Sequence, residues 1–138
     1  MTDQDEFDKF YLRTTNPFLA ARWGDGYRGI YRTNAVIDRI AGVTMDETLK
    51  KRIVGEARFL RALMYFNLVR AFGDVPLVLT EIIDPSEGYA FSRAPVADVY
   101  AQIVKDLTDA EGVLAERYTG ADVGRATRGA AKSLLGKV

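Results

Sequence analysis

The 138-residue sequence contains no cysteine and no histidine. Without cysteine the chain can form neither a disulfide nor a thiolate metal site. Without histidine it also lacks the usual zinc ligand sets, the Ser-His-Asp triad and the Cys-His dyad. Its 19 Lys and Arg are matched by 19 Asp and Glu, so no excess positive charge favours nucleic acid as a partner. We therefore expect no metal, no cofactor and no nucleic-acid ligand.

Long hydrophobic runs are missing as well, and none approaches the roughly 20 residues that span a bilayer. The first ten residues, MTDQDEFDKF, are acidic and polar, so we expect no secretory signal in this chain. What is present is an ordinary globular composition, 48% hydrophobic and 28% charged. That balance predicts one folded domain over residues 1–138.

The sequence centres on residues 56–72, which contain neither Gly nor Pro and consist mostly of strong helix formers. Apolar residues leave this segment almost no polar face, and such a helix must be covered by other helices on several sides. Gly73 can take the left-handed position at its end, Asp74 can form a local turn, and Pro76 cannot continue a helix. We predict a buried central helix followed by a short extended segment at 75–79.

Apolar residues at three- and four-residue steps predict more helices, and the four expected in all cover about residues 25–41, 45–72, 95–116 and 127–138. Thr44 and Thr127 are placed as N-caps, and Pro95 as the first residue of its helix.

Residues before position 25 give a weaker pattern. The spacing of Phe7, Phe10 and Tyr11 indicates a short helix that Asn16-Pro17 breaks, and residues 20–26, with the single Trp, read as a loop.

The four helices pair into two antiparallel hairpins, 25–41 with 45–72 and 95–116 with 127–138, as in tetratricopeptide-like solenoids. The predicted fold class is therefore all-α, an α-α superhelix. The apolar stripe of the last helix is still running at Val138. We expect this chain to be part of a longer one, able to self-associate through an exposed edge at Leu134, Leu135 and Val138.

Several polar residues fall on apolar faces. Asn34 is either a ligand-binding amide or a buried amide satisfied by backbone groups, and the second reading is favoured because buried polar groups usually find such partners. Arg58 and Arg61 are either functional charges or partnered structural ones, and partnership is favoured. In the long loop 80–94, Tyr89 and Phe91 either present aromatic surface or pin the loop down, and pinning is favoured.

The block GEARFLRAL at 55–63, followed by Tyr65-Phe66 and FGDVPL at 72–77, resembles the hallmark of the SusD/RagB-like family. Arg93-Ala94-Pro95 and the segment 124–135 are similar to the family's later helices, and residues 23–40 to the helix before the block. The resemblance spans about residues 23–138. Its fold signature here is Glu56, Arg58, Phe59, Arg61, Gly73, Asp74 and Pro76.

The resemblance implies a lipid-anchored nutrient-binding protein on the outer membrane of Bacteroidota, partnered with a SusC-type TonB-dependent transporter. Full members are several hundred residues long and carry a signal peptide and a lipid-accepting Cys, neither of which this sequence contains. The chain therefore resembles the helical N-terminal part of a larger SusD-like domain. The signature residues are implied to build the fold and not to contact sugars.

Three functions follow for comparison. The resemblance favours non-enzymatic glycan binding, for which Tyr11, Arg13 and Asn16 have suitable chemistry, while Trp23 is better explained as a core residue. The alternative is a tetratricopeptide-like module that binds protein. An enzyme is disfavoured, because nothing in the sequence selects a catalytic carboxylate pair. We expect no catalytic residue.

Overall fold

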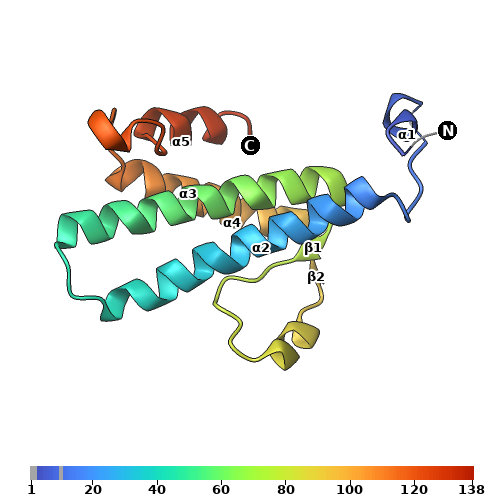
Figure 1. Cartoon of the computed structure of the whole chain (residues 1–138), viewed down its shortest axis with the longest axis horizontal. Coiled ribbons are helices and arrows are strands. Elements are labelled where there is room, and N and C mark those ends of the chain that lie inside the picture. The colour runs from blue at the N-terminus through green and yellow to red at the C-terminus, as the bar shows by residue number, and fades with distance from the viewer. Residues whose placement is uncertain (1–2, 10) are drawn as a thin grey trace.

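The computed structural model describes residues 3–9 and 11–138 and is built mainly of helices (Figure 1). The α-helices are α1 (Asp5–Asp8), α2 (Pro17–Arg39), α3 (Glu47–Phe72), α4 (Val96–Val113) and α5 (Arg128–Leu135). Short 3-10 helices lie at Ile40–Gly42 (η1), Pro85–Ala90 (η2) and Gly120–Asp122 (η3). A two-residue antiparallel pairing joins β1 (Val75–Pro76) to β2 (Arg93–Ala94).

Helix α3 is the centre of the molecule and lies between α2 and α4, while α5 packs on α4. Helices α2 and α3 run in opposite directions, as do α4 and α5 (Figure 1). The all-α class and the two antiparallel hairpins are thus confirmed. The largest fully buried side chains of the main core come from the central helix and its two neighbours and are Ile30, Tyr65, Leu68, Ile103 and Leu107.

Helix α2 begins eight residues earlier than predicted, so residues 20–26 are helical and not a loop. Asn16 caps the helix by accepting the backbone N–H of Phe18 at 3.0 Å, and Pro17 suits the first turn because its missing N–H would have no partner there. Of the two glycines in this stretch, Gly24 faces open space and Gly26 is a packing site. A Cβ at Gly26 would lie 2.9 Å from the side chain of Leu68, so glycine lets α2 approach α3 closely.

Helix α3 is capped by Asp46 and not by Thr44, since the Asp46 carboxylate accepts the N–H of Leu49 at 2.8 Å. At the other end Gly73 has the expected positive φ of 67°, with ψ −127°, so its backbone lies outside the left-handed helical region. Its N–H donates to the carbonyl of Val69 at 3.0 Å, which closes the last turn. The predicted stop after residue 72 is confirmed.

The second hairpin is shorter than predicted. Pro95 lies directly before α4 and not inside it, and α4 ends at Val113 instead of continuing to 116. Thr127 is the N-cap of α5, as predicted, and accepts the N–H of Ala130 at 3.1 Å. Helix α5 ends at Leu135, where the chain tightens into a turn.

Helix α1 stands at the end of the bundle, beyond the start of α2 (Figure 1). It is tied there by an edge-to-face contact between Phe7 and Phe18, whose ring centroids are 6.3 Å apart. The short predicted helix is present, but Phe10 lies outside the described residues and Tyr11 follows the helix.

Candidate functional site

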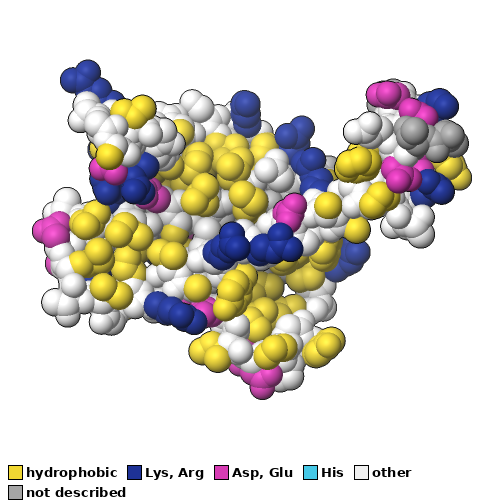
Figure 2. Space-filling view, viewed as in Figure 1, with side chains coloured by type: hydrophobic (Ala, Val, Ile, Leu, Met, Phe, Trp, Pro, Cys, Tyr) yellow, Lys and Arg dark blue, Asp and Glu magenta, His cyan; other side chains and the backbone are white. Residues whose placement is uncertain are grey.

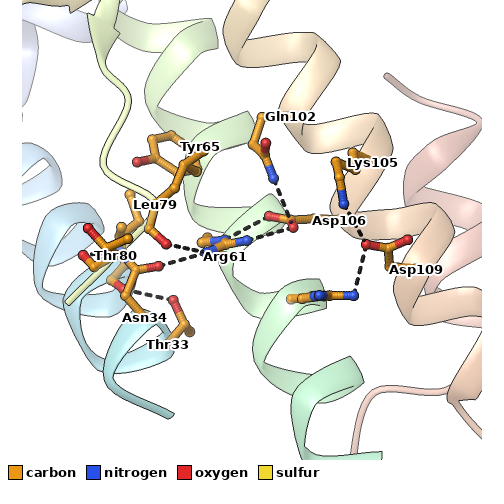
Figure 3. Close-up of polar contacts among 12 residues, drawn as sticks. Thr33, Asn34, Arg61, Tyr65, Leu79, Thr80, Gln102, Lys105, Asp106 and Asp109 are labelled. Atoms are coloured by element: carbon orange, nitrogen blue, oxygen red, sulfur yellow. Dashed lines mark hydrogen bonds and ion pairs between the residues drawn. The ribbon is translucent and has the colours of Figure 1, made fainter. Parts of the chain in front are cut away.

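A buried polar network joins α2, α3 and α4 (Figure 3). The Arg61 guanidinium donates to both carboxylate oxygens of Asp106 at 2.8 Å. It also donates to Asn34 Oδ1 at 2.8 Å and to the carbonyl of Leu79 at 3.1 Å. Arg61 and Asp106 are 5% and 1% exposed, so this is an ion pair inside the core.

The same network holds the extended segment after β1. The Asn34 amide donates to the carbonyls of Val78 and Thr80, each at 3.0 Å. The Tyr65 hydroxyl accepts the N–H of Val78 at 2.7 Å and donates to its carbonyl at 2.8 Å. Burial raises the pKa of Tyr65 to about 12, which keeps this donor protonated. The prediction that Asn34 is satisfied by backbone is confirmed, and Arg61 is partnered within the fold.

The other signature residues also serve the architecture. Arg58 pairs with Asp109 at 2.8 Å, and Glu56 with Arg125 at 2.9 Å, at the surface between α3 and its neighbours. Asp74 accepts the N–H of Val96 at 3.0 Å and so fixes the start of α4. Each of these contacts joins two segments of the fold, and the role of the block as a family fold signature stays a prediction.

A hollow of ≈ 350 Å³ lies where the N-terminal part of α2 meets the end of α3 and the strand β2. Its walls come from four segments of the chain, and the lining residues are Thr14, Leu19, Ala20, Trp23, Phe72 and Arg93. The Trp23 ring stands edge-to-face to Phe72, with centroids 5.1 Å apart, and 4.9 Å from the ring of Tyr27. Aromatic surface, a cation and a hydroxyl therefore face one space.

Trp23 belongs to the core, as predicted, because it packs against the main apolar cluster while still half-exposed. No sequence pattern places Phe72 and Arg93 beside Trp23, since they lie about 50 and 70 residues further along the chain. The only available signal was that Phe72 and Arg93 stand near the two ends of the segment 72–94, whose ends the β1–β2 pairing brings together.

The predicted carbohydrate-binding residues lie in the segment that leads into this hollow. Tyr11 is 64% exposed. The Arg13 side chain is 53% exposed and pairs with Asp3 at 3.1 Å and with the buried Glu6. Asn16 is only 1% exposed, and its amide donates to Glu6 Oε2 and to the Asp3 carbonyl, each at 2.9 Å. Two of the three side chains therefore face solvent, and the third holds the segment in place.

Glu6 organises that segment electrostatically. The hydrogen bonds from the Asn16 amide and the Arg13 N–H hold the pKa of the Glu6 carboxyl below its usual value, because both favour the charged form. Thr14, which lines the hollow, lies between these two donors in the sequence.

A second surface feature is the loop between β1 and β2. Tyr89 is 92% exposed and Ile83 is 81% exposed, whereas Phe91 is 37% exposed. The expectation that Tyr89 pins the loop is therefore wrong. Instead the loop is fixed at its base, where Arg39 pairs with Glu81 and the pairing of β1 with β2 holds the other side. In Figure 2 hydrophobic and acidic side chains gather at its projecting end, at the bottom of the view.

Within residues 3–9 and 11–138, no helix has the length and apolar character needed to cross a membrane. The same part of the chain brings together no group of three acidic side chains that could hold a metal ion.

Comparison with known proteins gives a consistent relationship. A SusD-like family model, described as starch-binding and associating with the outer membrane, matches residues 5–138. SusD-like protein P2 of Formosa agariphila is 33% identical over 102 residues, which are 74% of this chain and 20% of that protein. A SusD-like protein of Bacteroides ovatus is 31% identical over 96% of this chain and 24% of its own length.

Solved structures agree. A laminarin-binding SusD-like protein has 43% identity and a TM-score of 0.80, over 85% of this chain and 25% of that one. A structure described as being with xylogluco-oligosaccharide has 29% identity and a TM-score of 0.83, over 96% of this chain and 26% of that one. The chain thus spans about a fifth to a quarter of the length of these relatives.

Proposed function

Because this chain belongs to the SusD-like family, we propose that it forms the helical region of a non-enzymatic glycan-binding protein. Laminarin and a xylogluco-oligosaccharide, named for two of its structural relatives, support a carbohydrate as the ligand class.

The observation that carries this proposal is the hollow at the start of α2. Sugars are bound by flat aromatic surfaces that contact their C–H faces and by polar groups that hydrogen-bond their hydroxyls, much as other small-molecule sites combine apolar walls with a few polar groups. Trp23 and Phe72 offer the first, and Thr14 and Arg93 the second. No step of bond making or breaking is needed for such a site to work.

The exposed residues of the preceding segment extend the proposed surface. Tyr11 supplies a ring and Arg13 a guanidinium held by Glu6, and both face solvent. Asn16 does not contact the ligand, since its amide N–H groups and its oxygen are already hydrogen-bonded within the chain, and it acts by holding the segment 11–16 in place.

Trp23 gives the experiment its readout, because it is the only tryptophan of the chain and it lines the hollow. We expect an oligosaccharide that binds to change the intrinsic fluorescence saturably, and Thr14→Val and Tyr11→Ala to weaken binding without changing the far-ultraviolet circular dichroism. The matched control is Tyr31→Ala, which removes a 45% exposed ring on α2 outside the hollow. A panel of neutral and acidic oligosaccharides that leaves the fluorescence unchanged would refute the proposal.

The parent protein is proposed to lie at the cell surface, lipid-anchored to the outer membrane and partnered with a SusC-type transporter. Support comes from the family description, which places its members at the outer membrane. The loop with Ile83 and Tyr89 offers an apolar contact point for such a partner, because its base is fixed while both side chains are exposed.

A second candidate function, protein binding by a helix-repeat module, draws on the same loop and on α5. Leu134 is buried in the core, so the expectation that it is part of an exposed edge is wrong, whereas Leu135 and Val138 are partly buried and remain available to pair with another copy. Sedimentation of the isolated chain measures this self-association, which should disappear in Leu135→Glu, while Trp23 fluorescence should show that glycan binding persists.

A further inference from the structure

The hollow beside Trp23 is lined by one charged side chain, and no carboxylate among the described residues pairs with it. Arg93 is the only charged residue in its lining. Its Nη1 donates to the carbonyl oxygen of Asp74 at 2.8 Å, and its guanidinium carbon lies 5.8 Å from the Trp23 ring centroid. Across residues 3–9 and 11–138 no carboxylate forms an ion pair with it.

The surrounding acids are engaged elsewhere. The Asp74 carboxylate accepts the N–H of Val96 at 3.0 Å and is thereby directed to the start of α4. Glu6, the buried acid of the neighbouring segment, is paired with Arg13 and hydrogen-bonded to Asn16. Neither of these two carboxylates therefore forms an ion pair with Arg93.

We propose that this hollow takes a sugar bearing an anionic group, a carboxylate or a sulfate, which Arg93 holds while Trp23 and Phe72 contact the sugar ring. The assignment rests on the proposed glycan-binding function and narrows its ligand class. The Nε and Nη2 groups of Arg93 have no protein partner among the described residues, and that edge of a guanidinium matches the two oxygens of a carboxylate or sulfate. Neighbouring aromatic rings lower the local dielectric, which strengthens the attraction.

A neutral sugar would use this site less well. Its hydroxyls would accept hydrogen bonds from the exposed Arg93 guanidinium but would bring no opposite charge to it. A carboxylate or sulfate adds that charge and can accept two parallel hydrogen bonds from the guanidinium. The preference should therefore be electrostatic and should decline as salt is added.

The test measures dissociation constants by Trp23 fluorescence for three probes of similar length: an oligouronate, a sulfated galactan oligosaccharide and a neutral laminari-oligosaccharide. We expect at least one anionic probe to bind about tenfold more tightly than the neutral one at low salt, an advantage of the size that one charged hydrogen bond supplies. The advantage should shrink at high salt. The anionic probe that binds more tightly shows whether the site prefers a carboxylate or a sulfate.

Arg93→Gln should weaken the binding of the anionic probes far more than that of the neutral probe and so abolish the preference, and Arg93→Lys should keep part of it. Arg70→Gln is the matched control: Arg70 is exposed, lies 5.0 Å from the Phe66 ring centroid and is outside the hollow. Equal binding of all probes, or a preference that survives Arg93→Gln in a folded protein, overturns the anionic assignment alone. A failure of every probe to bind overturns the glycan-binding function with it.

Discussion

Removing Asp106 should test the account of the buried network most directly. In Asp106→Ala, Arg61 stays at 5% exposure and loses both charge-assisted bonds of 2.8 Å, keeping only its contacts with Asn34 and the Leu79 carbonyl. Breaking a buried ion pair by removing one partner costs about 3–5 kcal/mol, because the remaining charge is uncompensated. That is a large share of the roughly 5–15 kcal/mol that stabilises a typical domain.

The matched control lies one helical turn away. Asp109 pairs with Arg58 and Lys105 at 2.8 and 3.0 Å, but its side chain is 32% exposed and that of Arg58 is 33% exposed. Because such pairs are screened by solvent, Asp109→Ala should cost about 0–1 kcal/mol. Both variants remove a carboxylate from α4, so their difference isolates burial.

Urea denaturation followed by circular dichroism at neutral pH measures both changes. We expect the midpoint of Asp106→Ala to fall far below that of Asp109→Ala. The double change Arg61→Met with Asp106→Leu should recover much of the loss, since an apolar pair of similar volume can replace a buried ion pair without penalty. If Asp106→Ala and Asp109→Ala destabilise equally, the network does not hold the helices together and the reasoning is refuted.

Two further predictions concern packing and pH. Gly55→Ala should destabilise the fold by about 1–3 kcal/mol, because its Cβ would lie 2.5 Å from Val113 Cγ2. Gly112→Ala, where no atom lies within 4 Å of the added Cβ, should instead stabilise the fold by up to about 1 kcal/mol. Thermal unfolding compares the two variants, and equal effects would contradict the close approach of α3 to Val113. The pKa of Glu6 is lowered from 4.5, so the stability that it gives to the N-terminal segment should be present above pH 4.5 and be lost as pH falls through the lower folded value. Proteolysis of that segment should therefore accelerate in acid, and Glu6→Gln should remove the pH dependence.

The helices were largely predictable because their signals are local. Residues 56–72 contain no helix breaker, and Gly73 and Pro76 end the helix whatever the rest of the chain packs against it. The start of α2 was not predictable in the same way. Gly24 and Gly26 weaken helix propensity, and the close packing of Gly26 on Leu68, together with the Asn16 cap, compensates.

The N-caps show the same distinction on a smaller scale. Thr44 and Asp46 both have side chains that can cap, and their order in the sequence does not select one. The extended backbone of Asp46, with ψ at 130°, places its carboxylate on the N–H of Leu49, so the geometry of the turn after η1 made the choice.

The candidate site likewise has features that were predictable from the sequence and features that were not. The sequence indicated that residues 11–16 have polar and aromatic chemistry suited to sugars, and the resemblance indicated the ligand class. It did not indicate that Asn16 would be buried as a cap, or that Arg93 would lie over Trp23. Both depend on contacts between segments that are distant in the sequence.

By itself the sequence determined that this chain is all-α, that its central helix is buried, and which family it resembles, because periodicity and helix-end residues act over a few positions. Only the tertiary structure decided that Asn34, Arg61 and Asp106 form one network and that Trp23, Phe72 and Arg93 share a hollow. The β1–β2 pairing and the close approach of α2 to α3 bring these groups together. Such contacts are set by how whole elements pack, and no local pattern encodes them.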